Sequence, residues 1–345
     1  MAEGQPYFRG ATWARWDSGL YMDIAAHGYS LVPCGAGYPP GSWCGNAGWF
    51  PAYPGLMAVL DRVGVPLATA GMIISALFAL GTLVVLWVGL LDREPSRGSY
   101  LALGFAAFLP GMIYHHAVFP LSMAAFFLVL ALAFLRRGRW LLAGAAGFVG
   151  AMAYPTFVVV APVVAAWVLW QGRGRTWLGR VGEAAAASVP IAAGFGAVLL
   201  IQRIETGAWD AYFKVQDKYH HELMSPITTW VDAVRPAFEG AKGLGAMPSV
   251  QAAVVGILIV LTTGWLIAVR RTLDPLDWLA LAATLALWLF PLTQAEVHLY
   301  RPDALLVPLA LLVRRLPAVL QVASVACVAL LAVPVSEAFF RGLLV

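Results

Sequence analysis

Long apolar runs recur along most of this chain, and they limit its fold more than any other feature. We predict ten helical membrane segments, at residues 64–91, 100–113, 117–135, 140–153, 155–170, 181–203, 250–269, 276–293, 303–313 and 317–335. A hydrocarbon core of roughly 30 Å needs about 20 helical residues, or fewer where a helix is short or broken. Hydrophobic residues make up 61% of the chain, which excludes an ordinary soluble domain. The sequence therefore predicts an all-α polytopic membrane protein.

Compact basic clusters between alternate segments predict the orientation in the membrane. The positive-inside rule assigns such clusters to the cytoplasm, and they lie at residues 136–139, 173–180, 270–271 and 314–315. We therefore expect an outer loop at 1–63, a helical bundle at 64–203, a second outer loop at 204–249 and the rest of the bundle at 250–345. The net charge of +4 is largely accounted for by these clusters, so no nucleic-acid partner is expected.

Both outer loops contain a stretch that predicts a helix lying along the membrane surface. Asp17, Tyr21 and Ile24 recur at helical spacing in the first loop, and aromatic residues do so over 209–219 in the second. A Gly/Pro-rich loop then carries Cys34 and Cys44 on the oxidising side of the membrane. A disulfide bond between the two cysteines is expected, and a pair of free thiols is the alternative.

Asp17 is the main candidate for chemistry. An isolated carboxylate among apolar and aromatic neighbours at the membrane face is costly unless it is paired or used. An ordinary helix N-cap explains the same residue equally well, because Asp just before a helical stretch is what capping predicts. Both explanations stay open from the sequence.

Histidines at two outer positions are further candidates. His115 and His116 lie at a helix break, where a neutral imidazole can accept a proton and an imidazolium can hold a phosphate. Simple hydrogen bonding is the alternative there. His220 and His221 follow Lys218 in the second outer loop, where a solvated helix face is the alternative.

A polar tip between two late apolar segments offers a binding site for phosphate. The stretch EVHLYRPD contains His298 and Arg301, and a guanidinium there is suited to clamp a phosphate group. An interfacial anchor of the Tyr/Arg kind is the alternative. Tyr154 and Pro155 interrupt an earlier apolar run, where a plain turn between two half-length helices is the simpler explanation.

The first outer loop resembles that of a known enzyme family. The stretch RWDSGLYMDIAAHGY at 15–29, followed by WFPAYPGLMAVL at 49–60, is similar to the GT-C glycosyltransferases of the PIG-V type, the GPI mannosyltransferase 2 family and its bacterial relatives. The two linked motifs match at Arg15, Trp16, Asp17, Ser18, Tyr21, Ile24, Ala25, Gly28, Tyr29, Phe50, Pro51, Tyr53 and Pro54.

Weaker similarity continues along the rest of the chain, with departures. His116 stands where the family commonly has a Glu, and Tyr154 stands where it commonly has an Arg. Gln216 resembles part of an element in the second large loop, and LYRPDALLVP resembles a late Arg/Tyr-containing turn. Family members usually carry a membrane helix before the first motif, and none is visible here, so an upstream start or a reduced variant is expected.

The resemblance implies a GT-C-type helical bundle and a sugar transfer with inversion at the anomeric carbon. The donor would be a polyprenyl-phosphate sugar, usually mannose, and the acceptor a hydroxyl of a glycolipid, glycan or protein. The expected place is the extracytoplasmic face of a bacterial plasma membrane. The sequence contains no GxGxxG and no P-loop lysine, which agrees with chemistry that uses no nucleotide.

The resemblance also implies roles for individual residues. Asp17 would be the general base. The donor phosphate would be held by Arg301, His298, His220 and His221. Other substrate contacts would come from Arg15, Trp16, Tyr21, His115, His116, Tyr154 and Gln216. No cofactor is required; a divalent metal held by Asp17 with Asp23 or Asp303 is an option that is not predicted.

Two other function classes remain open from the sequence. A lipid or solute transporter would use the same outer polar tips to line a substrate entry, and inverted repeats with broken helices at the midplane would support it. No such repeat is visible in the sequence. A non-catalytic membrane scaffold would explain the departures at His116 and Tyr154, although the retention of Asp17 favours an enzyme.

Overall fold

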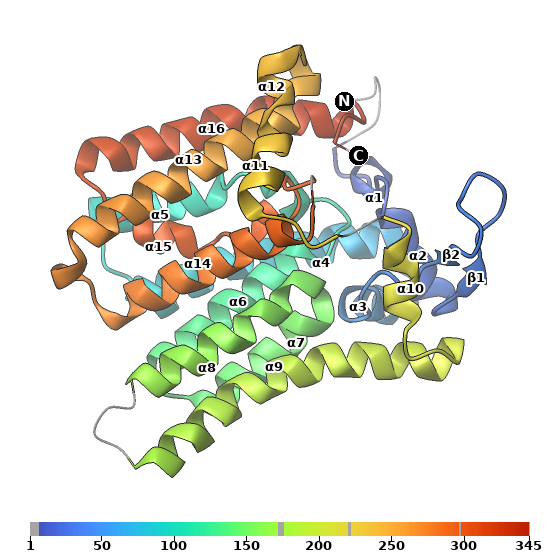
Figure 1. The fold of residues 1–345 in the computed structure, drawn as a ribbon, viewed down its shortest axis with the longest axis horizontal. Helices are drawn as coiled ribbons and strands as arrows, with labels where there is room; N and C mark the ends of the chain where they lie inside the picture. Colours follow the sequence, from blue (N-terminus) through green and yellow to red (C-terminus); the bar gives the residue numbers. More distant parts are fainter. Residues whose placement is uncertain (1–6, 172–175, 220–221, 297, 345) are drawn as a thin grey trace.

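The structure is a computed structural model that describes residues 7–171, 176–219, 222–296 and 298–344 (Figure 1). The α-helices are α1 Gly10–Trp13, α2 Ser18–His27, α3 Ala52–Asp61, α4 Leu67–Val85, α5 Arg97–Ala107, α6 Leu121–Arg136, α7 Trp140–Ala153, α8 Val160–Gln171, α9 Trp177–Thr206, α10 Ala211–Asp217, α11 Pro226–Val234, α12 Pro236–Glu239, α13 Met247–Ala268, α14 Pro275–Thr293, α15 Pro308–Val313 and α16 Ala318–Phe340. Short helices of other types are η1 Leu86–Leu90, η2 Met112–His115, η3 Pro155–Val159, η4 Gly243–Ala246, η5 Arg270–Thr272 and η6 Pro302–Leu305. The strands are β1 Leu31–Pro33 and β2 Trp43–Gly45.

The helical membrane class is confirmed, but ten membrane spans are not. Within the described residues, five helices are long and apolar enough to cross a membrane: Leu67–Leu90, Trp177–Thr206, Gly243–Ala268, Pro275–Thr293 and Ala318–Phe340. The other expected segments are helical but shorter. The 14 residues of α7, for example, rise only about 21 Å, which is less than a typical hydrocarbon core of roughly 30 Å.

Helices α6, α7, α8 and α9 lie side by side and form one flank of the bundle (Figure 1). Glycines let α7 and α9 approach closely. A Cβ built on Gly194 would lie 2.3 Å from the carbonyl oxygen of Phe148, and one on Gly147 would lie 2.4 Å from Cγ1 of Ile191. Small residues are the usual means of close helix packing in membranes, because lipid offers no hydrophobic drive to associate helices.

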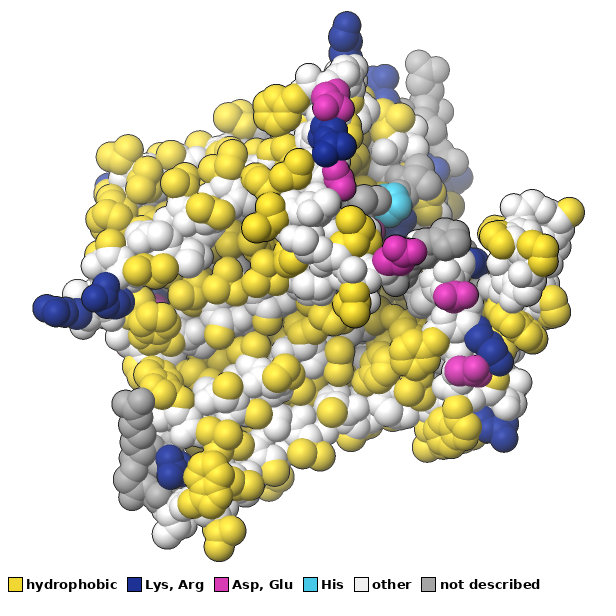
Figure 2. Space-filling view, viewed as in Figure 1, with side chains coloured by type: hydrophobic (Ala, Val, Ile, Leu, Met, Phe, Trp, Pro, Cys, Tyr) yellow, Lys and Arg dark blue, Asp and Glu magenta, His cyan; other side chains and the backbone are white. Residues whose placement is uncertain are grey.

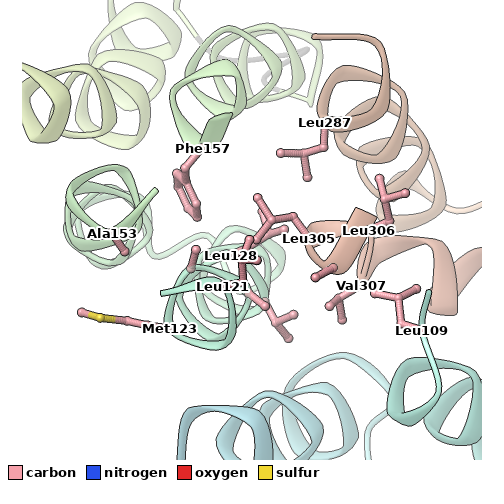
Figure 3. Packing of buried hydrophobic residues seen from close by; sticks show 14 of the residues in the cluster. Leu109, Leu121, Met123, Leu128, Ala153, Phe157, Leu287, Leu305, Leu306 and Val307 are labelled. Carbon is pink, nitrogen blue, oxygen red and sulfur yellow. The ribbon is translucent and has the colours of Figure 1, made fainter. Parts of the chain in front are cut away.

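A buried plug occupies the centre of the bundle. It consists of η6, α15 and the turn between them, and its residues from Pro302 to Val313 are all buried. Leu305 lies beside Leu128 of α6, and Leu287 of α14 and Phe157 belong to the same buried cluster (Figure 3). The plug therefore fixes the position of residues 298–301, which directly precede it in the chain.

Charged side chains gather at the two ends of the bundle and over α11 and α12, and they leave an apolar flank between them (Figure 2). At one end, Asp277 is fully buried and pairs with Arg314 and Arg315 at 3.5 and 2.7 Å. Asp274 shares these arginines and closes a capping box with Asp277 at the start of α14. The opposite end carries α1, α2, the β1–β2 hairpin and α10 (Figure 1).

We expect Gly194→Ala to destabilise the folded protein by roughly 1–3 kcal/mol, because the new methyl group would overpack against the backbone of α7. Gly196 lies in the same helix with nothing within 4 Å of a built Cβ. Gly196→Ala is therefore the matched control and should leave stability equal or slightly higher. Thermal unfolding of both variants in detergent micelles checks this; equal melting temperatures would contradict the close α7–α9 contact.

Candidate functional site

A tight turn between α1 and α2 presents the motif residues Arg15, Trp16 and Asp17. Trp16 has a φ of 42°, in the left-handed region that bulky residues rarely adopt. Its ring packs edge-on against Phe339 of α16, with ring centroids 5.1 Å apart, and the backbone N–H of Arg15 donates to Oγ of Ser18 at 2.9 Å. Such strain persists only where surrounding contacts hold it, and it often marks a functional site.

Asp17 precedes the first residue of α2, but its side chain does not cap that helix. Its Oδ2 instead accepts a hydrogen bond from Nη1 of Arg301 at 2.5 Å. The two residues are 284 positions apart in the chain. The structure therefore favours the paired carboxylate over the N-cap, and it joins the first outer loop to the late polar tip.

Two aromatic rings lie beside the guanidinium of Arg301. Its Cζ lies 5.8 Å from the ring centroid of Phe119 and 5.9 Å from that of Tyr300. The Phe119 ring contacts Tyr21 and Tyr114 edge-on, at 5.9 and 5.1 Å. Cation–π contacts of this kind stabilise a desolvated charge. The Nε–H of Arg301 is buried and has no hydrogen-bond partner among the described residues, so the guanidinium retains a donor.

The phenols of Tyr21 and Tyr154 lie within the electrostatic influence of the Asp17–Arg301 pair. Burial raises the pKa of the Tyr21 phenol well above its usual value, and the nearby negative charge of Asp17 raises it further. Burial also raises the pKa of Tyr154, where the charges of Arg301, Glu296 and Asp17 all act. Both phenols therefore stay protonated at neutral pH and can donate hydrogen bonds to an anionic or hydroxyl-rich ligand.

Two buried polar side chains hold the turn that carries Arg301. Nε2 of Gln251 donates to Oδ2 of Asp303 at 3.0 Å and to the carbonyl of Tyr300 at 3.3 Å. Nε2 of His115 lies 2.9 Å from the carbonyl oxygen of Ala304, where a ring N–H donates. Burial lowers the pKa of His115 to about 4, so the imidazole is neutral at physiological pH. His115, expected as a substrate contact, serves here as a support for the backbone.

Other predicted site residues lie around this centre with partners of their own. His298 pairs with Glu296 at 3.2 Å and contacts the Tyr300 ring edge-on. His116 packs beside Trp13, with ring centroids 6.0 Å apart. Gln216 donates to the carbonyl of Gly48 at 3.1 Å and so fastens the loop to α10. The predicted phosphate ligands His220 and His221 lie outside the described residues.

The carboxylates considered for a metal each have a different partner. Asp17 pairs with Arg301, Asp303 accepts from Gln251, and Asp23 accepts from Asn46 at 2.7 Å. No group of three or more His, Cys, Asp or Glu side chains with a metal-binding arrangement occurs among the residues that the structure describes.

Several residues that build the site were not predicted. Phe119 lies within a continuous apolar stretch and gives no sequence signal. Gln251 does give one, because an amide inside an apolar segment is costly unless it has a specific partner. Asn46 is buried and bonds the backbone of Gly28 and Ser30 as well as Asp23; in a Gly-rich loop it could not be told from an ordinary turn residue.

Comparison with known proteins does not assign this chain to a family. No model of a known protein family matches the chain, and no curated protein matches it significantly. The site itself combines one carboxylate, one arginine with a spare donor, and protonated tyrosines at the loop-bearing end of a membrane bundle. Such an arrangement can bind a phosphate group and accept a proton from a hydroxyl beside it.

We expect Arg301→Gln to weaken binding of inorganic pyrophosphate roughly tenfold or more, because charge-assisted hydrogen bonds contribute about 1.5–3 kcal/mol each. Asp17→Asn removes the competing carboxylate and should bind pyrophosphate at least as tightly as the unchanged protein. Titration calorimetry in detergent measures both. Weaker binding in Asp17→Asn, or no change in Arg301→Gln, would contradict an anion site at Arg301.

Proposed function

We propose that this protein is a membrane glycosyltransferase of the GT-C superfamily, related to the PIG-V type. It moves a sugar, with mannose as the expected one, from a polyprenyl-phosphate carrier to an acceptor hydroxyl, with inversion. The observation that carries this proposal is the Asp17–Arg301 pair. It places a carboxylate that does not serve as a cap beside a guanidinium that has a spare donor, within the motif that resembles the family.

In the proposed reaction, Asp17 acts as the general base. The acceptor oxygen attacks the anomeric carbon and forms the new C–O bond, while its proton passes to the carboxylate of Asp17. The bond between the anomeric carbon and the phosphate oxygen breaks, and its electron pair leaves with the phosphate. Arg301 stabilises the negative charge that develops on that oxygen.

The ion pair gives a physical reason why proton transfer to Asp17 and departure of the phosphate are coupled. Before the reaction, the guanidinium of Arg301 lies against the carboxylate of Asp17 and neutralises its charge. As charge develops on the leaving phosphate, the guanidinium is attracted to it and the carboxylate is less neutralised. Proton acceptance by Asp17 and departure of the phosphate thereby support each other.

The proposed location is a bacterial plasma membrane with the site on the extracytoplasmic face. The site lies at the end of the bundle that carries the long loops, while the RR pair at 314–315 lies in the ion-pair cluster at the other end (Figure 1). The positive-inside rule favours that orientation. A lipid-linked donor fits this place, because its chain can stay in the bilayer while its phosphate reaches Arg301.

We expect Asp17→Asn to reduce sugar transfer from a labelled polyprenyl-phosphate-mannose roughly 10²–10⁴-fold, because general-base catalysis contributes about that much. Asp23→Asn is the matched control, since Asp23 lies in the adjacent helix but bonds Asn46 and His27 instead of Arg301. The assay uses purified protein in vesicles, and carrier binding is measured in parallel.

The outcomes of that assay separate the proposals. Turnover that is lost in Asp17→Asn but largely kept in Asp23→Asn supports the transferase and its base. Carrier binding without turnover in the unchanged protein would contradict the enzyme and favour a scaffold. Carrier movement between leaflets without sugar transfer would favour a transporter.

A further inference from the structure

Helices α11 and α12 carry a row of large hydrophobic side chains that the rest of the described chain leaves uncovered. Ile227, Val231 and Phe238 are 75%, 42% and 81% exposed. The backbone N–H of Arg235 donates to the carbonyl of Val231, and that of Glu239 donates to the carbonyl of Arg235, so the helical path continues from α11 into α12. Steps of four and seven residues along such a path lie on one face, so the three side chains form a single hydrophobic row.

The opposite face of α11 is packed against the bundle. Ala233 and Val234 belong to a small buried cluster with Ala252 of α13 and Leu292 of α14. Nε1 of Trp230 donates to the carbonyl of Ala252 at 3.0 Å. These contacts fix the orientation of α11 on α13 and α14, and with it the direction in which the hydrophobic row points.

A charged row runs beside the hydrophobic row. Arg235 pairs with Asp232 at 2.8 Å and with Glu239 at 3.8 Å. Figure 2 shows these charges over α11 and α12, with hydrophobic side chains next to them. A helix that exposes one apolar stripe and one charged stripe is typical of an element that lies in the interface between membrane and water.

Both ends of this pair of helices are tied to the ends of membrane spans. The backbone N–H of Met224, shortly before α11, donates to the carbonyl of Thr293 at 3.1 Å. Thr293 is the last residue of the span Pro275–Thr293. At the other end, α12 stops at Glu239, just ahead of the span Gly243–Ala268. The two helices therefore lie at the level where these spans leave the bilayer.

The hydrophobic row continues a surface that already faces lipid. Ile257, Val260 and Leu261 are exposed, and all three lie within the span that contains α13. Hydrophobic side chains cover α11, α12 and α13 on the same face of the molecule (Figure 2). An exposed hydrophobic patch rimmed by polar side chains marks an interaction surface. At this level of the molecule, the surface beside the patch is the lipid itself.

We propose that α11 and α12 form an interfacial anchor, in which Ile227, Val231 and Phe238 enter the lipid surface while the charged row stays among headgroups and water. The anchor fixes the depth at which α14 ends, ahead of the turn that carries Arg301. Arg235 is already paired with two carboxylates, so the anchor holds neutral and anionic lipids alike. This inference goes beyond the proposed function and does not rest on it, because it concerns only contact with lipid.

Nitroxide labels on single cysteines test the anchor. The protein carries Cys327→Ser, keeps its disulfide bond and is placed in vesicles of neutral phospholipid. Labels at Ile227→Cys and Phe238→Cys should relax more strongly with oxygen, which concentrates in lipid, than with a water-soluble nickel chelate. The ratio of oxygen to nickel accessibility should be severalfold higher there than at Thr228→Cys. That variant is the matched control, because Thr228 is exposed and lies one helical turn before Asp232 of the charged row.

A second measurement changes the lipid. Vesicles that contain anionic phospholipid should give the same ratios at Ile227→Cys and Phe238→Cys, because the anchor offers apolar side chains and no unpaired cation. A label at Leu261→Cys in α13 supplies the value expected for hydrocarbon. Melting temperatures of the labelled variants should equal that of the unlabelled protein, since the substituted side chains are exposed.

Three results would overturn the inference. Ratios at Ile227 and Phe238 as low as that at Thr228 would place the hydrophobic row in water. Low accessibility to both reagents would indicate that a second copy of the chain covers the row, and spin–spin broadening between labels would identify that copy. A high ratio that requires anionic lipid would show that charge, and not the hydrophobic row, holds the helices at the membrane.

Discussion

The ion pair between Asp17 and Arg301 connects the parts of this protein on which its site depends. Asp17 lies in a loop ahead of the first long helix, and Arg301 lies at the entrance to the buried plug formed by η6 and α15. In a chain with 12% charged residues, a partly buried pair of this kind is costly to desolvate unless its geometry and surroundings compensate. The aromatic rings of Phe119 and Tyr300 beside Arg301 supply part of that compensation.

Rigid supports on both sides keep the pair in place. The plug is packed among Leu128, Leu287 and Phe157 (Figure 3), and Gln251 and His115 hold its backbone by hydrogen bonds. On the other side, the strained backbone of Trp16 is held by packing against α16. Contacts on both sides therefore hold the Asp17–Arg301 pair in a defined geometry.

The helices could be predicted from the sequence because apolar runs and helix breakers act locally. The segments expected at 140–153 and 276–293 match α7 and α14 within one residue. The number of membrane crossings could not be predicted in this way. Whether a 14-residue helix such as α7 crosses, stops halfway or packs inside depends on its neighbours, and periodicity carries no information about them.

Part of the candidate site was also visible in the sequence. Asp17, Arg301, Tyr21 and Tyr154 were all singled out, and the structure brings these four into one electrostatic environment. Gln216 and His115 were singled out too, but each bonds a backbone carbonyl and supports the site instead of facing a ligand. A polar residue type indicates only that a partner exists, and it does not say whether that partner is a substrate or the chain itself.

The sequence by itself determined that this is a helical membrane protein, because hydrocarbon tolerates a backbone only when it is internally hydrogen-bonded. It also determined that Asp17 needs a partner or a use. The tertiary structure alone decided that the partner is Arg301 and not the N-terminus of α2. That choice depends on a contact across 284 residues of chain, which only the packing of the plug against the rest of the bundle can bring about.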